Sequence, residues 1–291
     1  MRIPLLLATI LLLIRGIAHG QDILTVQVTP RVVGQGAVSL IVVSGPKHLE
    51  SVRGKFEERE IPLTLRPGDD TFQGLLGIDM NMNPGDHTLK VIAETTGRKL
   101  LTNALTLTVE KVNFGTQRLT LPRSMVDLDP KTLERVNKES KRIKALFKDI
   151  RDERLWQDTF IRPVKGEVTT PFGVRRILNN QPRNPHSGVD LRAPEGAPVG
   201  ACNDGVVVLV DEMFFTGKSV ILDHGWGMYS MYFHLSEVRV REGDRVRGGD
   251  IVGLAGSTGR ASGPHLHWGI RLNGARVDPL SLIGLNEYFE E

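Results

Sequence analysis

The sequence predicts a mainly β protein in which two β domains are joined by a helical linker. Residues 23–114 alternate apolar and polar side chains with a turn signal roughly every ten residues, which is typical of short strands. A single amphipathic helical pattern follows, and short extended segments separated by turns then run from residue 160 to the C-terminus. A chain of 291 residues is long enough to bury two hydrophobic cores.

The first predicted domain spans residues 21–114 and has the pattern of an immunoglobulin-like β-sandwich. Leu24, Val26 and Val28 point to one face of a strand, and turn signals such as Asn83-Pro84-Gly85-Asp86 separate the later strands. His48 and His87 each lie alone beside a turn, so we find no catalytic cluster in this part of the chain. We expect this domain to position the second domain or to bind a ligand that the sequence does not identify.

The linker, residues 115–159, contains one predicted helix. Asp129 is a favourable N-cap and Pro130 suits the first helical position. One face carries an apolar stripe and the other is basic; the stripe consists of Leu133, Val136, Ile143, Leu146, Phe147 and Ile150. Three roles fit this pattern: a helix packed on a domain with a solvated face, contact with an anionic polymer or membrane surface, and a cover that restrains the groove of the next domain.

The second predicted domain spans residues 160–291 and consists mainly of antiparallel strands in a compact, barrel-sandwich-like arrangement. Extended segments are predicted at 199–210, 219–223, 228–234, 251–255 and 265–272, and Asn273-Gly274 indicates a closing hairpin.

The N-terminus has the features of a secretory signal peptide over residues 1–20. Arg2 precedes an apolar run that ends at Ile14, and Ala18-His19-Gly20 offers small residues for cleavage. Cys202 is the only cysteine, so an intramolecular disulfide is excluded. Removal of residues 1–20 leaves 35 basic against 34 acidic residues, which argues against a nucleic-acid partner. We therefore expect an exported protein without a disulfide framework.

Histidines and one carboxylate in the second domain form a candidate metal site. His265 and His267 lie one residue apart in a strand and point to the same face. His186 and Asp190 lie four residues apart where a turn leads into a strand. A catalytic zinc needs three protein ligands and an open position, which this pair and one of the C-terminal histidines would provide. His234, on a strand face shared with Tyr232, could act beside the metal as a base or an electrophile.

Several motifs together resemble the lysostaphin-type (LytM-like) zinc metallopeptidases, which cut peptidoglycan cross-links. The resemblance covers residues 160–283, and the motifs occur in the same order as in the family. In this chain they are Phe172-Gly173-Val174-Arg175, His186-x-x-x-Asp190, Gly196-x-Pro198-Val199, Asp223-His224-Gly225, Tyr232-x-His234-Leu235 and Gly256-x-x-Gly259…Gly263-x-His265-x-His267. The set is specific because all motifs occur together. The sandwich and the linker helix also resemble the N-terminal part of some exported family members, less specifically.

The resemblance implies a zinc-dependent murein endopeptidase with one Zn²⁺ per chain and an open substrate groove. It implies that His186, Asp190 and His267 hold the metal and that His234 and His265 are the catalytic histidines. Tyr232 and Arg175 are expected to line the groove, although packing roles fit them equally well. The implied partners are stem peptides or cross-bridges of peptidoglycan, with the linker helix as a further contact to the wall or membrane surface. The implied location is the periplasm or cell envelope, or the medium after secretion.

Two other interpretations are less consistent with the sequence. Residues 240–253 resemble a biotinyl or lipoyl carrier hairpin, but neither Lys165 nor Lys218 has the setting of a modified lysine. A catalytically silent relative that binds cell wall or activates another hydrolase is the alternative function. Because all five metal and catalytic positions are present, we favour the enzyme. The architecture favours the D-alanyl-to-diaminopimelate cross-link, while the sequence leaves the bond, the N-terminal domain's role and the oligomeric state undetermined.

Overall fold

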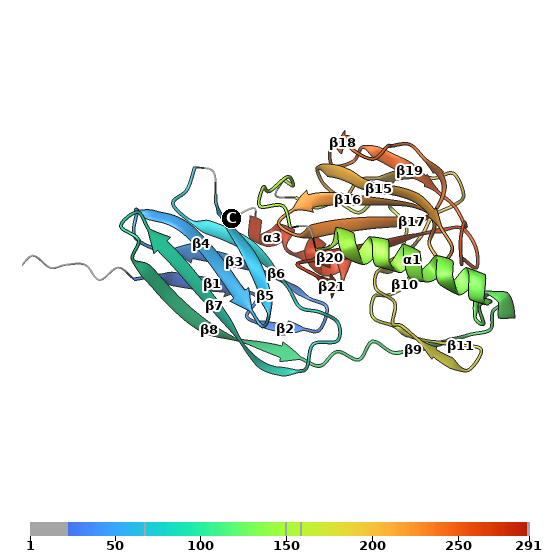
Figure 1. The fold of residues 1–291 in the computed structure, drawn as a ribbon, viewed down its shortest axis with the longest axis horizontal. Coiled ribbons are helices and arrows are strands. Elements are labelled where there is room, and N and C mark those ends of the chain that lie inside the picture. The colour runs from blue at the N-terminus through green and yellow to red at the C-terminus, as the bar shows by residue number, and fades with distance from the viewer. Residues whose placement is uncertain (1–22, 67, 149, 158, 290–291) are drawn as a thin grey trace, which may run out of the picture.

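The computed structural model describes residues 23–289 except 67, 149 and 158, and it confirms a mainly β protein (Figure 1). The predicted signal peptide lies outside the described residues. Among the described helices, none is long and apolar enough to cross a membrane.

The N-terminal unit is one curled eight-stranded sheet that folds over its own hydrophobic core. Its strand order is β1-β3-β6-β5-β4-β7-β8-β2, with β2 parallel to β8 and the other pairs antiparallel. The alternating residues of the sequence fill this core, as Ile61 and Leu63 show. The strands are β1 Thr25–Thr29, β2 Val32–Gly34, β3 Val38–Ser44, β4 Leu49–Phe56, β5 Arg59–Leu65, β6 Phe72–Gly77, β7 Gly85–Thr95 and β8 Leu100–Glu110.

The C-terminal unit is built on a ten-stranded sheet that carries the candidate site. The main path is β10-β13-β20-β17-β16-β15-β18, while β14, β19 and β21 pair beside it. The strands are β10 Val168–Thr170, β13 Val189–Arg192, β14 Pro198–Gly200, β15 Gly205–Met213, β16 Gly217–Gly225, β17 Met228–Val238, β18 Arg245–Val246, β19 Ile251–Ala255, β20 His265–Leu272 and β21 Ala275–Val277. Helices α2 (Pro279–Gly284) and α3 (Asn286–Phe289) end the chain.

The two units share a hydrophobic core, so the sandwich is held against the second domain. All residues of β6 are buried, because Leu75 packs into the C-terminal core while its neighbour Leu76 packs into the N-terminal core. An ion pair reinforces this interface, with Asp79 Oδ1 2.6 Å from Arg276 Nη2. The N-terminal unit is therefore packed against the second domain and is not joined to it by a flexible linker alone.

The linker contacts the second domain through a strand and through a helix. Its first part forms β9 (Thr116–Leu119), which pairs in parallel with β11 (Arg175–Leu178) in a small sheet that β12 (Gln181–Arg183) completes. After the short 3₁₀ turn Arg123–Met125, helix α1 (Pro130–Leu146) lies across the outer face of the large sheet (Figure 1). The Asp129 carboxylate accepts hydrogen bonds from the first-turn backbone, which confirms the predicted N-cap.

Only part of the predicted apolar stripe of α1 is packed. Ile143, Leu146 and Phe147 contact an outer cluster on β15, β16 and β17, whereas Leu133 is 48 % exposed and Ile150 is 40 % exposed. The helix therefore packs on the second domain through the C-terminal part of its stripe. The N-terminal half of α1 is instead held to the sheet by polar contacts, so it does not need apolar burial.

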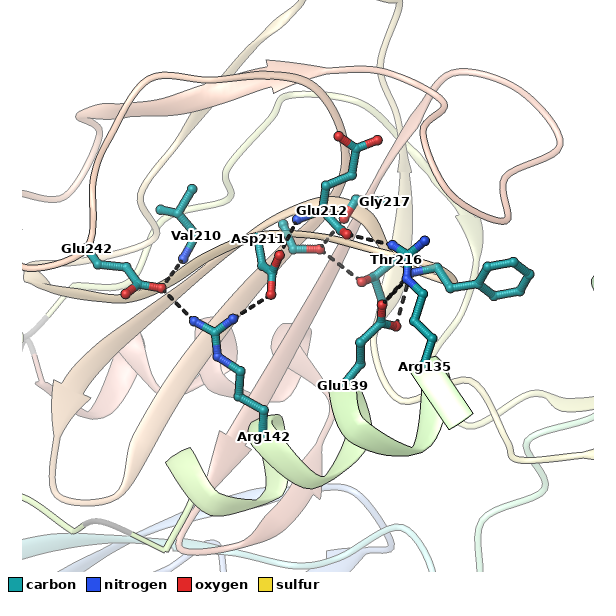
Figure 2. Close-up of polar contacts among 11 residues, drawn as sticks. Arg135, Glu139, Arg142, Val210, Asp211, Glu212, Thr216, Gly217 and Glu242 are labelled. Carbon is teal, nitrogen blue, oxygen red and sulfur yellow. Dashed lines mark hydrogen bonds and ion pairs between the residues drawn. The ribbon is translucent and has the colours of Figure 1, made fainter. Parts of the chain in front are cut away.

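These polar contacts join α1 to the β15–β16 hairpin (Figure 2). Arg142 bridges Asp211 and Glu242, at 2.5 Å from Asp211 Oδ2 and 3.0 Å from Glu242 Oε1. One turn earlier, the Glu139 carboxylate accepts a hydrogen bond of 3.0 Å from the backbone N–H of Phe214. Part of the polar face thus serves to hold the hairpin, while its lysines remain at the surface.

Candidate metal centre and active site

Two neighbouring antiparallel strands bring the predicted ligands together. Asp190 on β13 lies directly opposite His267 on β20, and direct cross-strand neighbours have side chains in contact. His186 precedes β13, and its backbone N–H donates to Val174 O, which holds the loop before the strand. All three side chains belong to buried residues, with exposures of 2 % for His186, 6 % for Asp190 and 8 % for His267.

The donor atoms of these three residues form a tight triangle. His186 Nε2 lies 2.9 Å from Asp190 Oδ1 and 2.8 Å from His267 Nδ1, and His267 Nδ1 lies 2.9 Å from the same carboxylate oxygen. The described residues contain this one cluster with metal-ligand geometry. Two nitrogens and one oxygen at this spacing match the donor types of a catalytic zinc site.

The tautomers of the histidines are set by backbone carbonyls. His186 Nδ1 lies 2.9 Å from Pro171 O, and because a carbonyl only accepts, this nitrogen carries the proton. The lone pair of His186 Nε2 therefore points at Asp190 and His267. A hydrogen bond from the second nitrogen to a carbonyl is the usual support of a metal-binding histidine.

The charge state of the triangle also suits a cation. Burial lowers the pKa of His267 to about 4, so its imidazole is neutral at pH 7. The Asp190 carboxyl lies between the two imidazoles, with its Oδ1 2.9 Å from a nitrogen of each ring. The result is a carboxylate beside neutral imidazole, in which lone pairs face one another. This donor set fits a divalent metal ion.

His234 and His265 lie together beside the triangle. Their ring centroids are 4.8 Å apart, and His265 Nε2 is 3.7 Å from Asp190 Oδ1. His234 Nδ1 donates to Thr258 O and His265 Nδ1 donates to Gly263 O, each at 2.8 Å, so both Nε2 atoms keep a lone pair. The structure thus places the two histidines assigned as catalytic next to the three assigned as ligands.

A β-bulge determines the direction of His234. The register between β16 and β17 shifts between the pairs Lys218↔Leu235 and Val220↔Tyr232, and His234 has a left-handed φ of 64°. As a result Phe233, whose ring stacks on His267 with centroids 5.4 Å apart, and His234 both face the site. The expectation that Tyr232 and His234 share a strand face is wrong, because alternation fails at a bulge.

The expected groove positions need two corrections. Tyr232 is fully buried in the domain core, where its hydroxyl accepts hydrogen bonds from Cys202 N at 2.8 Å and Ser230 Oγ at 2.9 Å, so it does not line a groove. Arg175 is exposed at the start of β11 and lies outside the cavity, whereas the next residue, Arg176, lies in its wall. Strand alternation explains this one-residue difference.

A cavity of about 220 Å³ lies against Asp190, His234 and His265. One wall comes from the linker, which contributes Gln117, Leu119, Leu121, Pro122 and Met125. The cavity is also lined by two residues that the sequence did not single out, Arg176 and Arg260. No sequence motif identified Arg260, because it lies in a glycine-rich loop after β19 that only the fold places here.

Hydrogen bonds fix the linker segment over this cavity. The Asn179 side-chain amide bonds the backbone of Leu121 in both directions, at 2.9 Å each. Arg183 Nη2 donates to Val126 O at 3.1 Å, and Arg260 Nη1 donates to Met125 O at 3.2 Å. We call residues 116–126 the covering segment. It is this segment, and not helix α1, that borders the site.

Known proteins resemble the chain in the region that carries this site. Residues 184–279 match the model of peptidase family M23. The DD-carboxypeptidase/endopeptidase Mpg of Neisseria meningitidis serogroup B is 41 % identical over 115 residues, which are 40 % of this chain and 26 % of that protein. The peptidoglycan DD-endopeptidase ShyA of Vibrio cholerae is 37 % identical over 117 residues, 40 % of this chain and 27 % of that protein. The chain thus spans about a quarter of the length of these relatives.

One solved structure resembles nearly the whole chain. A crystal structure assigned to peptidase M23 from Pseudomonas aeruginosa covers 86 % of this chain and 94 % of its own, with a TM-score of 0.67 and 29 % sequence identity. The similarity therefore includes the N-terminal unit as well as the region around the histidines.

Proposed function

We propose that the chain is a zinc-dependent endopeptidase that hydrolyses peptide cross-links of peptidoglycan, because residues 184–279 match the model of peptidase family M23. The observation that carries the proposal is the triangle of His186, Asp190 and His267 with His234 and His265 beside it. The relatives named as DD-endopeptidases support the same reaction class and substrate.

The site residues divide into metal ligands and proton carriers. His186 Nε2, Asp190 Oδ1 and His267 Nδ1 would hold one Zn²⁺, which supplies a Lewis acid and lowers the pKa of a bound water to about 7. Hydrolysis of an amide also requires a proton to leave the attacking water and a proton to reach the departing nitrogen. His265 and His234 are the groups placed for these transfers.

The two histidines have different environments. Burial is the main cause that lowers the pKa of His234 to about 3, so its Nε2 accepts a hydrogen bond but is a weak base. His265 is half-buried, and its Nε2 lies nearest to Asp190. We assign proton removal from the water and proton delivery to the leaving nitrogen to His265 Nε2. His234 then orients the water and the developing oxyanion region.

The experiment that tests the function is digestion of purified sacculi with and without a zinc chelator, followed by mass analysis of the fragments. We expect chelator-sensitive release of peptides cut at cross-links, with the D-alanyl-to-diaminopimelate bond as the preferred site. Absence of such cleavage would refute the proposal. Metal analysis separates the enzyme from the silent wall-binding alternative, because a protein that never retains zinc favours the latter.

We also propose that the covering segment restrains access to the site. Leu121 and Met125 lie in the wall of a cavity of about 220 Å³, a volume smaller than most ligand sites, which hold about 300–1,000 Å³. A peptide strand must therefore displace the segment. Asn179→Ala removes both hydrogen bonds to Leu121 and should raise activity on sacculi. Unchanged or lower activity with unchanged zinc content would contradict the restraint.

Export is a further part of the proposal. The basic and apolar N-terminus argues for delivery to the periplasm or cell envelope, where peptidoglycan is available. Cell fractionation of the tagged protein tests this. Recovery in the cytoplasm with the N-terminus uncleaved would refute it.

A further inference from the structure

Two arginines lie in the wall of the cavity that the catalytic histidines also line. Arg176 comes from the middle of β11, and Arg260 comes from the loop between β19 and β20. Both line the same cavity as Asp190, His234 and His265. A ligand in this cavity would therefore lie beside both guanidinium groups and both histidines.

The arginines are poorly compensated by the protein. Arg260 stacks on Phe215, with its guanidinium carbon 4.0 Å from the ring centroid, and donates one hydrogen bond to Met125 O. In the part of the chain that the structure describes, no carboxylate lies within ion-pair distance of Arg260. Its position is thus held by an aromatic ring and a carbonyl, which leave further N–H groups available.

Arg176 has one acidic neighbour, and that neighbour is a metal ligand. Arg176 Nη2 lies 3.3 Å from Asp190 Oδ2, while its buried Nε has no hydrogen-bond partner among the described residues. The bond is long for a charge-assisted pair, which is usually 2.7–2.9 Å. An unpaired buried guanidinium donor is costly, so a ligand that accepts from it would be stabilised.

The two positive charges act on each other. Burial, together with the charges of Arg176 and Arg183, lowers the pKa of Arg260 to about 10, so Arg260 is still charged at pH 7. Arg183 also lacks an ion pair among the residues described; its Nη2 bonds the Gln181 side chain and Val126 O. A negative group entering the cavity would relieve this repulsion.

We propose that Arg176 and Arg260 bind a carboxylate of the substrate that lies next to the scissile amide. This inference rests on the proposed function and narrows its substrate class. In a D-alanyl-to-diaminopimelate cross-link, the carbon that bears the scissile nitrogen also carries a carboxylate, whereas an internal glycine of a cross-bridge has none. Arginine suits this role because its planar donors match the geometry of a carboxylate. The two arginines are specificity determinants, and the enzyme selects anionic stem-peptide cross-links over neutral bridges.

The test uses the zinc-loaded protein and two synthetic peptides with the same scissile D-alanyl amide. One peptide carries a free carboxylate beside the scissile nitrogen, and the other carries the corresponding carboxamide. For the wild type we expect kcat/KM to be at least about 10-fold higher for the carboxylate, mainly through KM, which is the effect of a charge-assisted hydrogen bond. Arg260→Met and Arg176→Met should reduce this ratio toward one, and the lysine variants should retain part of it.

Controls separate recognition from folding. Arg245→Met removes an exposed arginine on β18, at the opposite edge of the large sheet, and should leave the ratio as in the wild type. Zinc content and melting temperature identify any variant that fails to fold. If a methionine variant fails to fold, the lysine variant at the same position is used to measure whether the ratio of kcat/KM for the carboxylate and carboxamide peptides falls.

The outcomes distinguish the inference from the proposed function. Equal cleavage of both peptides by the wild type, or an unchanged ratio in both methionine variants, would overturn the inference while the endopeptidase stands. If the wild type cleaves neither peptide, the proposed function fails. Calorimetric measurement of the binding of both peptides then tests whether the arginines recognise the carboxylate. Equal binding of carboxylate and carboxamide would then overturn the inference, and weaker binding of the carboxamide would support it.

Discussion

Gly188→Ala is a one-methyl change that should weaken the metal site without removing a ligand. Gly188 directly precedes β13 and lies against β20, where a Cβ would be 2.4 Å from Trp268 O and 2.8 Å from His267 Nε2. Both distances are shorter than the ordinary contact range of 3.4–4 Å. Because one neighbour is backbone and the other is the ring of a ligand, the methyl group can be accommodated only by movement of the site.

The magnitude follows from these distances. Restoring ordinary contact requires β13 and β20 to separate by up to about 1 Å, whereas a functional constellation tolerates about 0.5 Å. Perturbing the support of a metal ligand typically reduces metal affinity by about 10–100-fold, or ~1.4–2.8 kcal/mol. Overpacking of this kind also lowers the free energy of unfolding by about 1–3 kcal/mol.

The assay is competitive zinc titration with a chromophoric chelator, together with urea unfolding of the metal-free protein. Gly263→Ala is the matched control, since it adds the same methyl group two residues from His265, where nothing lies within 4 Å. We expect the control to bind zinc as the wild type does. Wild-type zinc affinity and stability in Gly188→Ala would show that the strand pair is not the rigid frame of the site.

Three further predictions concern the site and the domain interface. His267→Ala should lose both zinc and turnover, whereas His265→Ala should keep zinc and lose turnover; equal metal retention would contradict this division of roles. Zinc at about 100 times its Kd should raise the free energy of unfolding by about 2.7 kcal/mol in the wild type but not in His267→Ala, as thermal or urea unfolding will show. Asp79→Asn should lower stability by about 1–3 kcal/mol at pH 7, because it removes the negative charge and one of the two oxygens that accept hydrogen bonds from Arg276. Burial opposes ionisation of Asp79, but hydrogen bonds from Arg276 hold the pKa of Asp79 below its ordinary value, so this deficit should shrink as pH falls below about 4; a constant deficit would contradict the assignment.

The metal site was largely predictable because its signals are local. His265 and His267 share a face through the two-residue period of a strand, and the spacing of His186 and Asp190 placed both at one turn-to-strand junction. What the pattern could not supply was the pairing of the two strands. Register between β13 and β20 sets Asp190 opposite His267, and register depends on the whole sheet.

The errors have a common physical cause. Tyr232 was misplaced because the bulge in β17 interrupts alternation, and a bulge arises from pairing with two neighbouring strands rather than from the strand's own residues. Arg175 was chosen instead of Arg176 because sequence does not show which face of β11 meets the cavity.

By itself, the sequence predicted the mainly β class and the helical linker from period and turn spacing. Donor chemistry indicated a candidate metal site, and the family resemblance supplied the full set of five histidine and aspartate positions. Only the tertiary structure decided that Arg176 and Arg260 meet at one cavity and that residues 116–126 cover it. It also decided that the sandwich shares a core with the second domain. The physical reason is that local patterns specify which face a side chain takes, whereas contacts between distant segments are set by how complete sheets pack.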